Sequence, residues 1–483
     1  MVPFGCVVGA VLAWLLWLAW PHLLPIGGGS DLTHHLLLID YIDRTGRLVH
    51  DPGMVPYLGE MAHYTPGAHL LAVVAGRWMR TDGLHAMYPV LAASVAIKAG
   101  VVFLIARRCV RHVVLALVAP LLLFLPSTYS LGSFAHDSFF AQVVGELFAV
   151  TAWWAIVCWD QEPSPIAAAI AGLAGTATFL TWPVWIGPVI LTFAAVAWFR
   201  GDQRRGVRAR HFAVAVAPVA AVAVLHAAKH FGAAAIAGAP GFAPLPTPGI
   251  TGWLFPALGV IGTAAALFDR RQRTIPILLA AIAIQAVALV VVARASGAEA
   301  PYLALKMFYL AIYPLAVAGA IAIAAMFRSA GVSDGARGFS RASPSLVAWS
   351  LVLVLILLIG RFVIATPRPT PAISDSLLEA GRWARTHVPP ACVDYLVADD
   401  DSAYWLHLAV LGNPRAAPRS LASDTFEPQK ALVRWILPGG LPYAIADDVS
   451  ALPKDISTNV DVLARFGSAA VVKRHGESSC PER

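Results

Sequence analysis

The sequence predicts an all-α, polytopic membrane protein with a small α/β domain at its C-terminus. Hydrophobic residues make up 58% of the 483 residues and charged residues only 13%, whereas a soluble domain is usually about 45–50% apolar and about 25% charged. The mean hydropathy is +0.69, and long apolar runs recur along most of the chain. This composition excludes intrinsic disorder, which needs low hydrophobicity and high net charge. The five cysteines are too few for a disulfide-dense scaffold.

About eleven apolar segments are candidates for transmembrane helices, each of which needs about 20 mostly apolar residues. They lie near residues 4–25, 86–106, 112–128, 139–159, 165–181, 183–199, 211–228, 250–268, 274–293, 303–327 and 345–366. A further apolar run at 66–79 is short and carries Arg77. Such runs are typical of interfacial or re-entrant segments, so we expect this one to lie on the membrane surface.

The arginines set the expected topology, because cytoplasmic loops carry an excess of Lys and Arg. With residues 66–79 on the surface and the N-terminus inside, the inner loops hold Arg107, Arg108, Arg111, Arg200, Arg204, Arg205, Arg208, Arg210, Arg270, Arg271, Arg273, Arg328, Arg337 and Arg341. Only the loop with Asp160 and Glu162 disagrees. We therefore expect the N-terminus in the cytoplasm and the C-terminus outside. The high content of Ala, Arg and Trp is typical of a GC-rich bacterial genome, so the expected location is the bacterial inner (cell) membrane. The net charge of +7 then reflects topology, and we expect no nucleic-acid partner.

The composition changes after about residue 367. The predicted organisation is a transmembrane module, residues 1–366, followed by an extracytoplasmic domain, residues 367–483. Short strand-like runs, such as Val393–Val397 and Ala469–Val472, indicate a mixed α/β fold for this domain. Cys392 and Cys480 both lie in it, and two outer cysteines favour one disulfide bond; the alternative is two free thiols.

The first outer segment, residues 27–83, carries the candidate catalytic residue. Its sequence Gly27-Gly28-Gly29-Ser30-Asp31 precedes apolar residues at helical spacing, which predicts a surface helix that starts at Ser30 or Asp31. In that helix Asp31, His34 and His35 share a face, which can bind a cation or a phosphate or hold a carboxylate base. The alternatives are an N-cap role for Asp31 and interfacial anchoring for both histidines. We expect the following Asp40 and Asp43 to be solvated.

Further polar residues gather on the expected outer face. Ionisable groups beside a membrane are energetically costly, so they often mark function. Candidates for substrate binding follow in the same segment and in the second outer loop: Glu60, His63, Tyr64, His69, His136, Asp137, Gln142 and Glu146. Glu146 lies about two turns inside a predicted span and therefore needs a partner or a wet cavity. His69 fits a packing role equally well. The cofactor is left open; a divalent cation is the candidate, with Asp31 and Asp137 as its candidate ligands.

The later outer loops add cations, namely Lys229, Arg294 and Lys306, the last in the sequence Pro301-Tyr302-Leu303-Ala304-Leu305-Lys306. Lys306 either snorkels to the lipid headgroups or provides a point charge for a phosphate. Carboxylates from one end of the chain and cations from the other are what a site needs to activate an acceptor hydroxyl and hold a phosphate leaving group. No P-loop and no dinucleotide-binding glycine motif occurs, so no motif indicates the use of ATP.

The order of these motifs resembles that of the GT-C superfamily of membrane glycosyltransferases, which includes aminoarabinose, O-mannosyl and arabinofuranosyl transferases. The resemblance rests on Ser30-Asp31-Leu32-Thr33-His34-His35, on Thr45-Gly46-Arg47-Leu48, on Tyr64-Thr65-Pro66-Gly67-Ala68-His69 and on Arg107-Arg108. It implies transfer of a sugar from a polyprenyl-phosphate donor on the outer face, with Asp31 as catalytic base or metal-linked carboxylate. The Tyr302–Lys306 segment is similar to a donor-phosphate-binding stretch in some members.

Two positions depart from the superfamily pattern. Leu32 stands where many members carry a second acidic residue, and His63 stands where the aminoarabinose transferases carry lysine. The hypothesis is a glycosyltransferase with Asp31 as general base, His34 or His35 shaping it, and Lys306 neutralising the donor phosphate. Its expected partners are the lipid-linked sugar, membrane lipid, and an envelope glycan, lipid or protein acceptor. The alternatives are a transporter or flippase of lipid-linked sugars and a non-catalytic envelope scaffold.

Overall fold

The structure is a computed structural model with two compact units. It describes residues 2–23, 31–49, 58–135, 139–201, 204–229, 243–295, 297, 302–329, 350, 353, 357, 360, 368, 371–413, 428–437 and 439–480. Unit 1 comprises residues 1–17, 91–133 and 141–368, and unit 2 comprises residues 18–90, 134–140 and 369–483. The C-terminal tail therefore groups with the first outer segment of the sequence.

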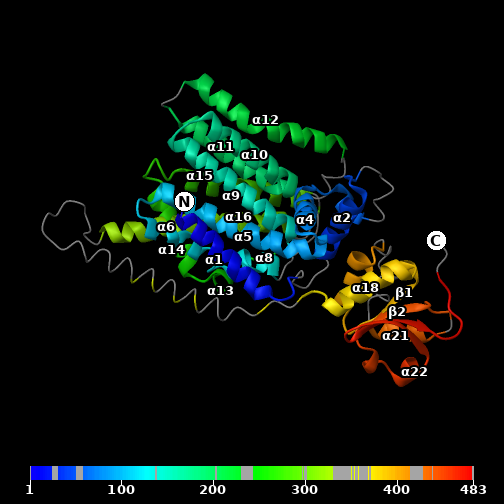
Figure 1. The fold of residues 1–483 in the computed structure, drawn as a ribbon. Coiled ribbons are helices and arrows are strands. Elements are labelled where there is room, and N and C mark those ends of the chain that lie inside the picture. The colour runs from blue at the N-terminus through cyan, green and yellow to red at the C-terminus, as the bar shows by residue number, and fades with distance from the viewer. Residues whose placement is uncertain are drawn as a thin grey trace. The chain divides into compact units, whose positions relative to one another are not determined.

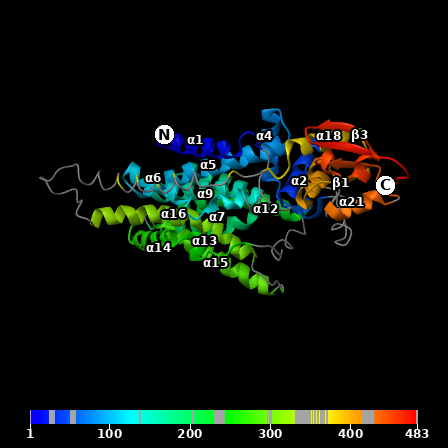
Figure 2. The ribbon, with the colours of Figure 1, turned by 90° about the horizontal axis from the view of Figure 1, so that it is seen from below.

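Unit 1 is helical, and its long helices α5, α9 and α16 run alongside one another (Figures 1 and 2). Its helices are α1 (Val2–Ala19), α5 (Gly83–Cys109), α6 (Val113–Leu122), α7 (Ser127–Ser130), α8 (Gly132–Ala135), α9 (Phe140–Gln161), α10 (Pro165–Thr181), η3 (Pro183–Trp185), α11 (Ile186–Phe199), α12 (Arg205–Lys229), α13 (Pro248–Thr251), α14 (Leu254–Ala266), α15 (Thr274–Ala295) and α16 (Tyr302–Ser329). The ends of α1, α5, α8 and α9 extend into unit 2.

Six of the described helices are long and apolar enough to cross a membrane: Val2–Ala19, Gly83–Cys109, Phe140–Gln161, Arg205–Ala228, Thr274–Ala295 and Tyr302–Phe327. Four shorter apolar helices, at 113–122, 165–181, 183–199 and 254–266, occupy further segments in which the sequence predicts spans. Large apolar side chains are exposed on the long helices, for example Val224 on α12 and Ile284 and Val291 on α15. This is expected of surfaces that face lipid. The protein is a multi-pass membrane protein. The span expected near 345–366 lies almost wholly outside the described residues.

Small residues let the helices of unit 1 approach closely, as is common in membrane proteins. A methyl group added at Gly262 of α14 would collide with the carbonyl oxygen of Ala318 in α16. A methyl group at Gly172 of α10 would lie 2.8 Å from the carbonyl oxygen of Ala215 in α12. These are also two of the most extensive helix pairs of the unit, so glycine sets the backbone separation where the contact is largest.

The first part of unit 2 contains α2 (Asp31–Thr45), η2 (Gly59–His63) and α4 (Gly67–Met79). The helix predicted to start at Ser30 or Asp31 is α2, and its apolar residues Leu36, Ile39 and Ile42 are buried. The short run at 66–79 is α4, a helix of 13 residues that follows Pro66. Both α4 and η2 pack against α2.

The C-terminal part of unit 2 is an α/β domain, as the sequence predicts. Its elements are α18 (Asp375–His387), η5 (Pro390–Cys392), β1 (Val393–Leu396), α19 (Asp400–Trp405), the π-helical turn η6 (Leu406–Val410), α21 (Pro428–Ile436), β2 (Tyr443–Ala446), η7 (Val449–Ala451), α22 (Lys454–Ser457), β3 (Val460–Phe466) and β4 (Ala469–Arg474). The strand order is β1-β2-β4-β3. β1 and β2 are parallel, and the other two pairs are antiparallel.

The sheet of this domain packs against α21 through a hydrophobic core and also contacts α18. Leu396, Ala444, Ala446, Ala470 and Val472 pack around Trp435 of α21 and Ile456 of α22. α18 contacts β2, β3 and β4, as well as η6. A disulfide bond joins Cys392 to Cys480, with 5.2 Å between their Cα atoms, and it ties the end of the chain to the start of β1.

Candidate active site

The predicted site residues fall into two groups, one in each unit. Some of them lie outside what the structure describes: His136 and Asp137 entirely, and the side chains of Asp31, Glu60 and Lys229. The candidate base and both candidate cation ligands are therefore not placed. Among the described residues, no group of three or more His, Cys, Asp or Glu side chains is arranged to hold a metal ion.

Two histidines predicted from the first outer segment meet in unit 2. The Nδ1 atom of His35 on α2 lies 2.9 Å from the Nε2 atom of His69 on α4, and both side chains are buried. The rings of Tyr64 and Phe140 contact both histidines edge-on or tilted. Burial lowers the pKa of His69 to about 3, so its imidazole is neutral at pH 7. Pro66 directly precedes α4 and starts it so that His69 falls in the first turn.

His34 has a different neighbour from His35, because successive residues of an α-helix point about 100° apart. The Nε2 atom of His34 lies 2.5 Å from the hydroxyl oxygen of Tyr404 in α19 of the C-terminal domain. The two ring centroids are 5.9 Å apart at an interplanar angle of 63°. His63, at the end of η2, is half-buried. Tyr404 is not among the residues that the sequence points to, although it enters the group that the sequence predicts.

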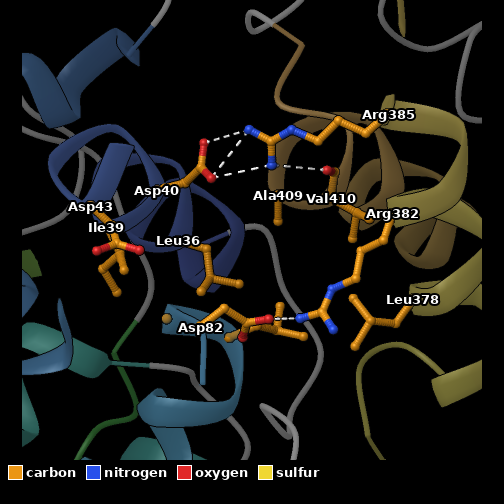
Figure 3. A pocket seen from close by; sticks show the side chains of 12 residues that line it. Leu36, Ile39, Asp40, Asp43, Asp82, Leu378, Arg382, Arg385, Ala409 and Val410 are labelled. Carbon is orange, nitrogen blue, oxygen red and sulfur yellow. Dashed lines mark hydrogen bonds and ion pairs between the residues drawn. The ribbon is translucent and has the colours of Figure 1, made fainter. Parts of the chain in front are cut away.

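A pocket of about 90 Å³ lies between α2, the start of α5 and α18 (Figure 3). Asp40, Asp43, Asp82, Arg382 and Arg385 provide its charges. Its apolar lining consists of Leu36, Ile39, Leu84, Leu378, Ala409 and Val410.

The pocket charges are paired in ways that correct one expectation from the sequence. Arg385 binds Asp40 with nitrogen–oxygen distances of 3.0 and 3.2 Å, and Arg382 binds Asp82. Arg77 donates to Asp43 at 2.9 Å. Asp40 and Asp43 are therefore partly buried ion-pair partners and not simply solvated, because helices α18 and α4 bring arginines to them.

In unit 1, the buried Glu146 has the partner that its position within a span requires. Its carboxylate is bound by Lys98 of α5 and by the hydroxyl of Tyr313 in α16. Gln142, one turn earlier on α9, donates to it at 3.4 Å. The Lys98 and Glu146 side chains are only 3% and 0% exposed. Removing one member of an ion pair buried this deeply leaves an uncompensated charge and strongly destabilises the protein. The network therefore helps to hold α5, α9 and α16 together.

Lys306 lies on a single aromatic face of α16. Residues 302, 306, 309 and 313 are spaced by four, three and four positions, which places them along one side of a helix. The Lys306 ammonium lies 5.0 Å from the ring centroid of Tyr302 and 5.4 Å from that of Tyr309, within the range of cation–π attraction. The side chain is fully buried, so it does not snorkel to a surface. Arg294, in contrast, is exposed in the last turn of α15.

Comparison with known proteins identifies the fold. Neither a family model nor a curated protein sequence matches the chain. The structure of ArnT from Cupriavidus metallidurans in the apo state is similar over 98% of this chain and 97% of that protein, with a TM-score of 0.55 and 17% identity. The chain has the GT-C fold.

Two further GT-C structures support the assignment. The archaeal oligosaccharyltransferase AglB from Archaeoglobus fulgidus, in complex with an inhibitory peptide and a dolichol-phosphate, matches 92% of this chain and 69% of its own, with a TM-score of 0.55 and 15% identity. The arabinofuranosyltransferase AftD from Mycobacteria matches 99% of this chain but only 40% of its own, with a TM-score of 0.57 and 15% identity. At these identities the likeness establishes the fold.

Sequence reasoning missed several residues of these groups, and only some of them left a signal. Lys98 is the one lysine in an otherwise apolar predicted span at 86–106, and a buried cation opposite Glu146 follows from the cost of an unpaired charge in a membrane. Arg382 and Arg385 lie one turn apart on an amphipathic helix, which marks a charged face but not its partners. Tyr404 left no signal that distinguishes it from a core tyrosine.

Proposed function

We propose that the protein is an integral-membrane glycosyltransferase. It transfers a sugar from a polyprenyl-phosphate donor to an envelope glycan, lipid or protein acceptor on the outer face of a bacterial cell membrane. The observation that carries the proposal is the GT-C fold over nearly the whole length of both this chain and ArnT. ArnT has been solved bound to undecaprenyl phosphate and AglB with a dolichol-phosphate, so a lipid-phosphate donor fits this fold.

The residues take complementary roles in this proposal. Asp31 acts as general base on the acceptor hydroxyl, and the histidines of α2 shape its surroundings. Lys306 neutralises the donor phosphate, helped by Lys229 or Arg294, while His136 and Asp137 bind substrate. Lys306 is buried beside the rings of Tyr302 and Tyr309, and a charge in such a low-dielectric site acts more strongly on a phosphate than one in water. Fixed positive charge near a leaving phosphate lowers the barrier to transfer.

The lipid-linked sugars of cells that carry variants test this function. Cells with Asp31→Asn or Lys306→Ala should accumulate one polyprenyl-phospho-sugar and lose one envelope glycan, relative to cells with the wild type. Asp461→Asn, which changes an exposed aspartate of the C-terminal domain, is the matched control and should leave both profiles unchanged. Unchanged lipid-linked sugars and intact surface glycans in both site variants would refute the transferase and favour a scaffold. Accumulation in the inner leaflet alone would favour a flippase.

A further inference from the structure

The C-terminal domain is tied to the first outer segment within unit 2 by side chains from one face of α18. Arg385 binds Asp40 of α2, and Arg382, one turn earlier, binds Asp82 just before α5 (Figure 3). Asp375 at the start of the same helix lies 2.5 Å from the Nδ1 atom of His22. η6 packs against both α18 and α2. Within unit 2, the domain is therefore fixed against α2 by side-chain contacts.

This attachment brings one polar side chain of the C-terminal domain into the histidine group of α2. Tyr404 lies in α19, and its hydroxyl oxygen is 2.5 Å from the Nε2 atom of His34. The helix that carries it is anchored at its start, where Asp399 accepts hydrogen bonds from both the backbone and the side chain of Ser402. Trp405, the next residue, is buried. The backbone that carries Tyr404 is thus held in place, and the hydrogen bond from its hydroxyl orients the His34 ring.

We propose that Tyr404 is a positioning residue of the transfer site, acting through His34, so that the C-terminal domain completes the site. This inference rests on the proposed glycosyltransferase function. Asp31 lies three positions before His34 on α2, so both residues occupy the same helical face. A histidine ring is oriented, and its tautomer chosen, by the hydrogen bond that one nitrogen makes. Tyr404 therefore helps to fix the tautomer and the orientation of the His34 ring.

The substitution Tyr404→Phe tests this role, because it removes the hydroxyl and keeps the ring. The C-terminal domain offers a matched control in Tyr395→Phe. The Tyr395 hydroxyl also bonds a histidine, His407 at 2.9 Å, but both residues belong to the C-terminal domain. The assay uses purified full-length protein in nanodiscs with polyprenyl-phospho-sugars extracted from the cells that accumulate them. Tyr404→Phe should lower kcat about tenfold, the effect of one lost hydrogen bond in an organised site. The KM for the donor should not change.

A double substitution shows whether Tyr404 acts through His34. If it does, Tyr404→Phe combined with His34→Gln should transfer sugar at the same rate as His34→Gln alone, because the shared interaction is lost only once. Additive losses would overturn the proposal, as would equal kcat values for Tyr404→Phe and Tyr395→Phe in the presence of an active wild type. A wild-type protein that transfers no sugar from any extracted donor would overturn the proposed function itself, and this inference with it.

Discussion

The guanidinium of Arg385 reaches both carboxylate oxygens of Asp40, at nitrogen–oxygen distances of 3.0–3.2 Å. One residue belongs to α18 of the C-terminal domain and the other to α2, and both are less than a third exposed. Arg385 also donates to the carbonyl oxygen of Val410 at 3.3 Å. Charge-assisted contacts that reach both carboxylate oxygens are among the stronger hydrogen bonds of proteins, so this pair anchors the domain.

Removing this pair should loosen the domain. The variants Arg385→Ala and Asp40→Ala, with their double mutant, should give a coupling energy of about 1 kcal/mol in the free energy of unfolding, since the pair is only partly shielded from water. Thermal unfolding in detergent and the rate of proteolysis of the C-terminal domain are the measurements. Arg44→Ala serves as control, because Arg44 binds the same aspartate from an exposed position on α2 and should couple to it by no more than about 0.5 kcal/mol. Equal coupling energies for Arg44 and Arg385 would contradict the anchoring role.

The buried Lys98–Glu146 pair predicts a strong and asymmetric response to substitution. Lys98→Met leaves the Glu146 carboxylate buried without its cation, which should lower the free energy of unfolding by about 3–5 kcal/mol. The double variant Lys98→Met with Glu146→Gln carries no buried charge and should recover most of that loss. Lys454→Met, in the C-terminal domain, is the control and should be neutral. The account of this network fails if the double variant is as unstable as the single one.

Burial of His69 predicts that acid destabilises the protein. The folded-state pKa of about 3 is below the usual 6.5, so the unfolded chain takes up a proton as the pH falls below 6.5 and the folded chain does not. Stability should therefore fall between pH 6.5 and 3 by up to about 1.4 kcal/mol per pH unit from this group. His69→Gln should flatten that slope in thermal unfolding, whereas the exposed His475→Gln should not. Equal slopes for wild type and His69→Gln would exclude this origin.

The contact of α14 with α16 predicts that Gly262 tolerates no side chain. Gly262→Ala places a methyl group against the Ala318 carbonyl, and overpacking of this kind costs about 1–3 kcal/mol. Gly9→Ala in α1 is the matched control, since a methyl group there meets no atom within 4 Å, and it should be neutral or slightly stabilising. Thermal unfolding of the two variants in the same detergent compares them. A neutral Gly262→Ala would show that the two helices can move apart without cost.

The sequence predicts the local structure of this protein well. Apolar runs place the helices from Val2–Ala19 to Tyr302–Phe327, and the glycines before Asp31 place the start of α2. Both signals depend on neighbouring residues along the chain, which periodicity and capping rules describe.

Contacts between distant residues are less predictable. His34 and Tyr404 are 370 positions apart, and Arg385 and Asp40 are 345 apart, so only the folded domain brings them together. Charge balance in the membrane is a partial exception, because a buried carboxylate such as Glu146 needs a partner or a wet cavity, and Lys98 is the one lysine of the predicted span at 86–106. The partners of Asp40 and Asp43 could not be predicted in this way. Polar residues on a helix face are expected to be solvated, and only the fold shows that Arg385 and Arg77 pair with them.

Transfer by purified protein tests the central claim most directly. Wild type and Asp31→Asn, each in nanodiscs, are given the polyprenyl-phospho-sugar that accumulates in Asp31→Asn cells, together with membranes that contain the acceptor. The release of polyprenyl phosphate is then followed. The account predicts release by the wild type and a rate at least about 100-fold lower for Asp31→Asn, the usual contribution of a general base. Equal rates for the two proteins would contradict it.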